Sequence, residues 1–254
     1  ASLMIKEGIM DKYKPDAMIA QHVYPEFEAG LFGFREGMYM ASTDEVYLKV
    51  IGKGGHAALP HNNIDPIIIA SSILIELQQI TSRIAPPTLP TVLSFGKITG
   101  EGATNVIPSI VEIEGTLRTM NEEWREKFHN AITEISQNVA KSFGGKCDVE
   151  IKKGYPFLVN DEKVTSICRD AANEYFGREF VKELDLRMTA EDFSYFSQHC
   201  PVCFYRLGVG YKDTTKNNSV HHPEFDIDSK SLLKGVESIS YLSLMLINKL
   251  NQSL

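Results

Sequence analysis

The sequence predicts an α/β fold in two segments, interrupted by an inserted α+β domain of the ferredoxin-like type. Two observations carry this prediction. Residues 42–152 show a β-α-β-β-α-β order of hydrophobic patterns, which is the split βαβ arrangement. Residues 1–41 and 153–254 instead show helices and apolar strands, typical of an incomplete α/β layer with a mixed sheet.

The first segment begins with a helical pattern over residues 2–8 and continues with one apolar strand. That strand covers residues 17–23, where an apolar run leads into Gln21, His22 and Val23. Pro25 is expected to end it, because proline cannot donate a backbone hydrogen bond to a sheet.

Four strands are predicted in the inserted block. Apolar and polar residues alternate over residues 46–50, and strands are also expected at 91–98, 111–118 and 147–151. Each alternating strand has one apolar face to bury, so together they predict a sheet covered by helices on one side.

Two helices separate these strands. Asp65 and Pro66 provide a cap and a first turn for an apolar helix over residues 67–84. Asn121 caps a second helix, whose apolar residues recur every three or four positions.

The last segment predicts a helix beginning at Asp161, a shorter helix over residues 191–198, a strand over 202–207 and a long terminal helix over 228–250. These elements need further strands to complete a layer.

Composition excludes several classes of function. The 254 residues are 43% hydrophobic and 23% charged, which is typical of a globular protein. The formal net charge of −7 argues against nucleic acid and against a polybasic membrane patch as partners. The longest apolar run noted, residues 241–247, is too short to span a bilayer, so no membrane partner is expected.

Four cysteines are too few for a disulfide scaffold, so we expect a reducing compartment and a cytoplasmic location. Cys200 and Cys203 form a Cys-x-x-Cys pair. A structural zinc would need a second pair of ligands, and a redox motif should open a helix. Packed thiols are therefore the favoured interpretation.

The seven histidines differ in how well their sequence positions suit a binding or catalytic role. His129 is predicted to be a flank or surface residue of its helix, and His61 a residue of a solvated turn. His22 ends an apolar strand, where binding groups collect in α/β layers, but a buried core histidine fits the same pattern. Of the adjacent His221 and His222, at most one is expected to reach a common centre with His22.

Two further features are open to more than one interpretation. The segment Lys53-Gly54-Gly55-His56 lacks the ending of a P-loop, so its glycines are interpreted as allowing a close backbone approach that presents His56. Arg118 lies on the polar face of its strand, where a salt bridge to Glu112 or Glu114 is the simplest role.

Six motifs in order closely resemble the M20 family of metallopeptidases and amidohydrolases, particularly its N-acyl-amino-acid, hippurate and auxin-conjugate hydrolase branch. The motifs are Gln21-His22-Val23-Tyr24-Pro25, Gly52-Lys53-Gly54-Gly55-His56-Ala57-Ala58-Leu59-Pro60, Asn105-Val106-Ile107-Pro108, Gly115-Thr116-Leu117-Arg118-Thr119, Glu191-Asp192-Phe193 and Val220-His221-His222-Pro223.

The resemblance implies a catalytic domain, formed by residues 1–41 and 153–254, and a lid at 42–152 that also makes a homodimer contact. It implies that His22 and His221 are metal ligands in a site for two divalent ions, zinc, manganese or cobalt. It further implies that His56 is a catalytic residue that crosses the dimer interface and donates to the oxyanion. Asn105 and Arg118 are then expected to bind the substrate, Arg118 by gripping its carboxylate.

By the same resemblance, the function is metal-dependent hydrolysis of the amide bond of N-acyl amino acids such as acetyl or benzoyl conjugates. In that family a Gly-x-Gly-His-Asp-like segment and a Glu-Glu pair precede the first of these six motifs. Neither precedes it in this sequence, so we expect the chain to lack its N-terminal part and to be inactive alone. Two alternatives stay open: a dipeptidase or carboxypeptidase acting on small peptides, and a non-catalytic dimerising or binding module.

Overall fold

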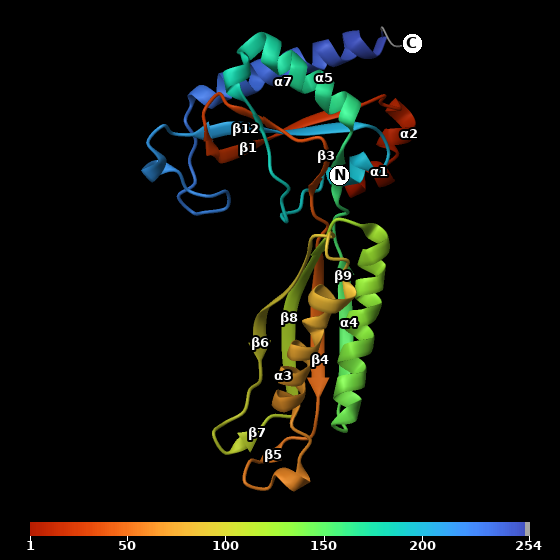
Figure 1. Ribbon diagram of the computed structural model, residues 1–254. Coiled ribbons are helices and arrows are strands. Elements are labelled where there is room, and N and C mark those ends of the chain that lie inside the picture. The colour runs from red at the N-terminus through yellow and green to blue at the C-terminus, as the bar shows by residue number, and fades with distance from the viewer. Residues whose placement is uncertain (252–254) are drawn as a thin grey trace. The chain divides into compact units, whose positions relative to one another are not determined.

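A computed structural model describes residues 1–251 (Figure 1). The chain divides into two compact units. Unit 1 comprises Ala1–Met40, Leu158–Arg187 and the residues from Glu191 onward, and unit 2 comprises Ala41–Phe157 with Met188–Ala190. Each unit is described below by itself.

Unit 2 is built on a four-stranded antiparallel sheet. In spatial order its strands are β6 (Thr91–Thr99), β8 (Ile110–Thr119), β4 (Asp44–Ile51) and β9 (Lys146–Lys153). With the intervening helices, the chain order is the predicted β-α-β-β-α-β. The inward-facing residues of β4 are buried and the alternate ones are more exposed, as the hydrophobic pattern requires.

The two helices of unit 2 pack against one face of this sheet (Figure 1). Helix α3 (Pro66–Leu77) is capped as predicted, because the Asp65 carboxylate accepts from the backbone N–H of Ile67 at 2.8 Å. A single π-helical turn, Ile80–Ile84, follows it. Helix α4 (Glu122–Ser142) is also capped as predicted, by Asn121 accepting from the N–H of Trp124 at 2.9 Å.

A small ribbon extends unit 2 beyond the Ile110 end of β8. It pairs β5 (Gly55–His56) with β7 (Val106–Ile107), and a 3₁₀ turn, Pro60–Asn62, follows β5. The predicted close backbone approach is confirmed, because a Cβ at position 54 would collide with the Ile107 carbonyl. His61 is exposed in the 3₁₀ turn, in agreement with its predicted position.

Unit 1 contains a mixed four-stranded sheet, as the sequence predicts for this layer. Its spatial order is β1 (Met18–Glu28), β12 (Val202–Gly210), β2 (Phe32–Phe34) and β11 (Val181–Glu183). β1 runs parallel to β12, β12 antiparallel to β2, and β2 parallel to β11. The prediction that Pro25 ends the first strand is wrong: β1 is an edge strand and continues with a register shift after Tyr24, which accommodates the proline.

Helices cover one face of the unit 1 sheet, and a second apolar cluster covers the other. Helices α5 (Glu162–Phe176) and α7 (Lys230–Asn251) pack together over β12 and share a core with Tyr205 and Cys203 (Figure 1). The alternate residues of β12, including Phe204, pack into the other cluster. β12 is consequently buried along its whole length.

Shorter elements complete unit 1. They are α1 (Ser2–Lys6), α2 (Ile9–Tyr13), the antiparallel ribbon of β3 (Gly37–Met40) with β10 (Leu158–Asn160), α6 (Ser194–Ser197) and the 3₁₀ turns Arg178–Phe180 and Thr214–Lys216. The predicted helix over 191–198 is thus only one turn long.

One helical stretch within the described residues has the length and composition of a membrane span. Pro66–Ile84 has a mean hydropathy of 1.3, and 28% of it is buried. The prediction that residues 241–247 come nearest to a span is therefore wrong. The longer apolar stretch at α3 is less obvious in the sequence, because scattered serines and glutamines interrupt it. Helix α3 places Ile69, Ile73 and Leu77 in the core of unit 2, as a core helix of a folded domain does.

Candidate functional site

His22 lies on β1 of unit 1, directly opposite Arg206 of β12 in the strand register. Its side chain is partly buried, and its Nδ1 is 2.8 Å from the carbonyl oxygen of Val23. A carbonyl can only accept, so Nδ1 carries the proton and Nε2 keeps its lone pair. A backbone carbonyl on one ring nitrogen is the usual way of orienting a histidine that binds a metal through the other.

His221 lies in the exposed loop between β12 and α7 and has a left-handed backbone, with φ at 74°. A non-glycine residue in this region is uncommon and is found more often at functional sites. The neighbouring His222 differs, because its Nδ1 accepts from the backbone N–H of Glu224 at 3.1 Å. That bond places the proton of neutral His222 on Nε2, so His221 is the better candidate ligand of the pair.

The histidines of unit 1 fit a metal centre individually, yet do not form one by themselves. In residues 1–251, no group of three or more His, Cys, Asp or Glu side chains is arranged to hold a metal ion. β1 and β12 are parallel, so the segments that follow them leave the sheet at the same edge, where ligands converge in α/β folds.

Arg206 is a candidate that the sequence pattern did not indicate. It is 5% exposed, and its Nε donates to the hydroxyl of Tyr39 at 2.8 Å. Among the described residues no carboxylate lies within ion-pair distance of it. A buried guanidinium is costly without an anion, so this position beside His22 is suited to an acidic partner. The signal in the sequence was a single arginine inside an otherwise buried strand.

His56 and Asn105 lie together at the tip of unit 2. The Asn105 carbonyl accepts from the N–H of Ala57 at 3.0 Å, and His56 pairs with Val106 across the β5–β7 ribbon. The Nδ1 of His56 accepts from the N–H of Ala58 at 3.1 Å. Neutral His56 must then carry its proton on Nε2, which makes this exposed ring edge a hydrogen-bond donor.

Arg118 lies at the other end of the same sheet. It is eight residues beyond Ile110 on β8, which corresponds to about 26 Å along the strand. The β5–β7 ribbon lies beyond the Ile110 end (Figure 1). The structure therefore brings His56 and Asn105 together but separates both from Arg118 within one chain.

Arg118 lines a cavity of about 750 Å³ on the face of the sheet opposite α3 and α4. The wall includes Thr116, Lys152 and the segment Met188–Ala190. The Arg118 side chain is half-buried, and its Nε donates to the hydroxyl of Thr116 at 3.2 Å. Burial lowers the pKa of Arg118 from its usual value, although the charge of Asp44 acts in the opposite direction.

The alternative role for Arg118, a salt bridge to Glu112 or Glu114, is wrong. Glu112 pairs with Lys49 at 3.8 Å and Glu114 with Lys97 at 2.7 Å. Across residues 1–251, Arg118 has no carboxylate within 4 Å. The two glutamates lie farther along β8 than the guanidinium reaches, so its charge faces the cavity.

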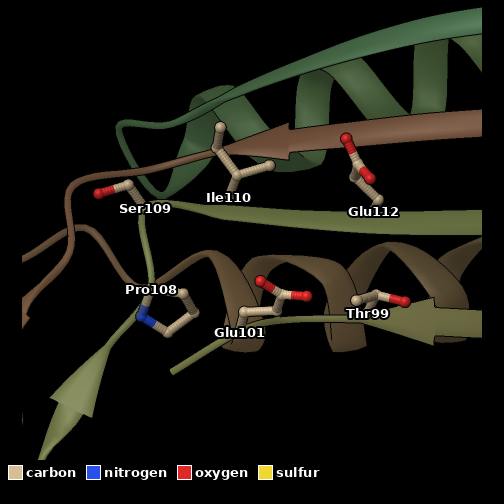
Figure 2. Close-up of a pocket in the computed structure, with 6 residues that line it drawn as sticks. All are labelled: Thr99, Glu101, Pro108, Ser109, Ile110 and Glu112. Atoms are coloured by element: carbon tan, nitrogen blue, oxygen red, sulfur yellow. The ribbon is translucent and has the colours of Figure 1, made fainter. Parts of the chain in front are cut away.

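A second hollow of about 360 Å³ lies at the Ile110 end of β8 (Figure 2). Figure 2 shows Glu101 and Glu112 beside Thr99, Pro108 and Ser109. The second hollow is lined by two carboxylates, whereas Arg118, Lys152 and Lys153 outnumber the one carboxylate, Glu45, in the first, so the Arg118 cavity suits an anionic substrate better.

His129 is not the surface residue that its helix pattern suggested. Its Nε2 is 2.6 Å from a carboxylate oxygen of Asp44, and its side chain is only 14% exposed. The prediction failed because positions 125 and 129 are one helical turn apart and both face the buried start of β4. Asp44 and Arg125 thus form a buried ion pair, and the partly buried His129 contacts the same carboxylate.

The cysteines behave as packed thiols. Cys203 and Cys168 are fully buried in one core, and no described cysteine forms a disulfide. The hydrogen bond to Cys168 and burial raise the pKa of Cys203 well above its usual 9.0. A thiol held protonated in this way is a poor nucleophile and a poor metal ligand.

Comparison with known proteins places these features in a family. The sequence profile of Peptidase family M20/M25/M40 matches residues 1–244. The chain belongs to this family.

Curated relatives of this M20 chain include two deacetylases. The N-acetyl-L-cysteine deacetylase of Bacillus subtilis is 37% identical over 234 residues, which are 92% of this chain and 54% of that protein. The N-acetyldiaminopimelate deacetylase of Exiguobacterium sibiricum is 31% identical, over 91% of this chain and 61% of that protein. The M20 chain therefore spans between half and two thirds of these relatives.

Solved structures agree with the M20 fold. A structure from methicillin-resistant Staphylococcus aureus has a TM-score of 0.81 and 30% identity, covering 96% of this chain and 62% of that one. A Bacillus subtilis protein, described as a dinuclear metal-binding peptidase of the M20 family, has a TM-score of 0.73 and 24% identity, covering 96% and 60%. The second likeness concerns the fold alone.

Proposed function

We propose that the complete protein is a metal-dependent amidohydrolase that cleaves the amide bond of N-acyl amino acids. The observation that carries this proposal is the cavity at Arg118, where a half-buried guanidinium faces open space with a neutral hydroxyl as its hydrogen-bond partner. A free amino-acid carboxylate is the anion that this geometry suits, since a guanidinium binds a carboxylate through two parallel hydrogen bonds. The named deacetylase relatives support the same class of substrate.

His56 is proposed to stabilise the oxyanion of the tetrahedral intermediate. The hydrogen bond from Ala58 leaves Nε2–H as the donor on the exposed edge of the ring. A preorganised donor aimed at developing negative charge is a large contribution to amide hydrolysis. Asn105, which shares the tip of unit 2, is proposed to bind the polar end of the substrate.

His22 and His221 are proposed as ligands of two divalent metal ions, zinc, manganese or cobalt. The Nε2 lone pair of His22 fits this role, because neutral imidazole is a ligand that these ions accept. When bound, such ions polarise a substrate carbonyl and lower the pKa of a bound water. The remaining ligands would come from polypeptide outside the described residues.

Unit 2 is proposed to act as a lid and to form a homodimer. Helix α3 exposes Ile67, Ile68 and Ile75, which are 42%, 53% and 71% exposed. A helix that is apolar all round is normally covered on both sides. Dimerisation would also explain how His56 could act with Arg118, since a second copy could bring its tip to this cavity. By this assignment, residues 1–41 and 153–254 belong to the catalytic domain and residues 42–152 to the lid.

The neighbouring alternative, a dipeptidase or carboxypeptidase, uses the same carboxylate grip. A panel of substrates separates the two. We expect the complete protein, loaded with Zn²⁺ or Mn²⁺, to hydrolyse N-acetyl, benzoyl or indoleacetyl amino acids faster than dipeptides. Hydrolysis of no member of the acyl panel would contradict the proposal, and faster cleavage of dipeptides would favour the peptidase. A non-catalytic binding module would bind the acyl amino acid without turnover.

The Arg118 assignment has its own test. Arg118→Gln should raise KM by at least about 100-fold, because the two hydrogen bonds to the carboxylate contribute about 1.5–3 kcal/mol each. Arg83→Gln is the matched control, since Arg83 is an exposed arginine of the same unit. An unchanged KM for Arg118→Gln would remove the carboxylate grip from the mechanism.

A further inference from the structure

We propose that Asp44, Arg125 and His129 are positioning residues for the Arg118 cavity, which they hold in shape from the opposite face of the sheet. The inference rests on the proposed function for the identity of the ligand, an amino-acid carboxylate. The coupling between the two faces of the sheet rests on contacts within unit 2.

The first contacts connect Arg118 to β4. The Nε of Arg118 donates to the Thr116 hydroxyl at 3.2 Å, and that hydroxyl donates to the backbone carbonyl of Asp44 at 3.0 Å. Thr116 therefore orients the guanidinium with reference to the backbone at the start of β4.

The Asp44 side chain anchors that backbone from the helix-covered face. Its carboxylate accepts from the Nε of Arg125 at 2.9 Å, from Nη2 of the same guanidinium at 2.5 Å and from the N–H of Gly154 at 3.1 Å. The His129 Nε2 lies 2.6 Å from the same group. Burial alone would raise the pKa of Asp44, but these hydrogen bonds outweigh burial and lower the pKa from 3.8 to about 2. The carboxylate is therefore charged at neutral pH.

Arg125 also holds two walls of the cavity directly. Its Nη2 donates to the carbonyls of Thr43 and Gly154, each at 3.1 Å, and both residues line the cavity. Glu122 balances the remaining charge, accepting from the Nη1 of Arg125 at 3.0 Å. One buried guanidinium thus fixes the backbone just before β4, at Thr43, and just after the neighbouring strand β9, at Gly154.

A positioning role predicts an effect that a purely stabilising role does not. A bidentate carboxylate grip depends on the position of the guanidinium, and small displacements of a binding group cost affinity. Removing the His129 contact deletes one of the two side chains that hold Asp44. The effect is expected at Arg118, on the other face of the sheet, and not only in the free energy of unfolding.

The experiment compares His129→Leu with His129→Gln in the ¹⁵N-labelled complete protein. Leucine removes the donor to Asp44, whereas glutamine keeps one. The readouts are the Arg118 Nε–Hε signal in the NMR spectrum, identified by its loss in Arg118→Lys, and the Kd for N-acetyl-L-cysteine. Lys127→Gln is the control, because Lys127 is exposed on the same helix and pairs with Glu123.

We expect His129→Leu to shift the Arg118 signal and to weaken N-acetyl-L-cysteine binding about fivefold. His129→Gln should restore both, and Lys127→Gln should change neither. A folded His129→Leu protein with an unchanged Arg118 signal and Kd would overturn the positioning role, even if its Tm falls.

A second pair keeps the test decisive if His129→Leu does not fold. Thr116→Val removes the hydroxyl between Arg118 and Asp44, while Thr116→Ser retains it, so only the valine variant should shift the Arg118 signal. An unchanged signal in Thr116→Val would refute the coupling. If the complete wild-type protein does not bind N-acetyl-L-cysteine, the proposed substrate class fails, yet the Arg118 signal still decides the positioning role.

Discussion

Replacing Asp44 by asparagine should destabilise unit 2 in a way that depends on pH. Asparagine keeps the shape of the side chain but removes the charge that Arg125 and His129 share. Arg125 would stay buried with only Glu122 as a carboxylate partner. Because breaking a buried ion pair leaves an uncompensated charge, we expect a loss of about 3 kcal/mol at pH 7.

The pH dependence follows from the pKa of Asp44, which is lowered from 3.8 to about 2. At 1.36 kcal/mol per pH unit, this depression corresponds to about 2.5 kcal/mol of folding free energy. A depressed carboxyl pKa contributes fully above pH 3.8, and its contribution is lost as the pH falls through about 2. The difference between wild type and Asp44→Asn should therefore shrink by about 2 kcal/mol between pH 5 and pH 2, and by the remainder below pH 2.

Urea unfolding followed by tryptophan fluorescence reports the stability of unit 2, which contains Asp44. The chain has one tryptophan, Trp124, next to Arg125 on α4. Glu45→Gln is the control, since Glu45 is the next residue on the strand and is exposed; it should change the free energy of unfolding by less than about 0.5 kcal/mol. A deficit in Asp44→Asn that stays constant from pH 5 to pH 2 would refute the electrostatic account.

Three further predictions concern activity, assembly and reactivity. His56→Phe should lower kcat of the complete enzyme by about 100-fold with little change in KM, because it removes one oxyanion donor; a change in KM alone would argue for a binding role. Ile75→Glu should convert a dimer to a monomer in analytical ultracentrifugation, whereas Leu232→Glu, at a comparably exposed site on α7, should not. In the folded protein, iodoacetamide should modify Cys200 before Cys203, since only Cys203 is fully buried; equal rates would contradict this packing.

The elements that the sequence predicted well are those with strong local signals. Asp65, Asn121 and Asp161 cap their helices as expected, because each offers a side-chain oxygen to backbone N–H groups within three residues. The sheet order of unit 2 followed from the chain order of alternating strands. The short strands β2, β3, β10 and β11 carry no such pattern, since three or four residues are too few to show a period.

The sequence proposes individual residues for the candidate site, but it does not predict the contacts among them. His22, His56 and Arg118 lie in motifs that the sequence shows plainly. Asp44, Arg125 and His129 depend on contacts between residues 81 to 85 positions apart, so no local pattern relates them. The sequence did not indicate Arg206 for a similar reason. One arginine in an otherwise apolar strand forms no pattern, and only the pairing with the neighbouring strand places it opposite His22.

The two histidines with proposed roles, His22 and His56, are prepared for opposite tasks by single backbone contacts. The Val23 carbonyl forces the proton of His22 onto Nδ1 and leaves Nε2 as a ligand, whereas the Ala58 N–H forces the proton of His56 onto Nε2 and leaves it a donor. A donor is useful to an oxyanion only where the substrate is held. Arg118 lies about 26 Å along β8 from Ile110, and the ribbon that bears His56 lies beyond that end of the strand. If both groups act on one small substrate, they must therefore come from two chains, which makes dimerisation a requirement of the proposed reaction.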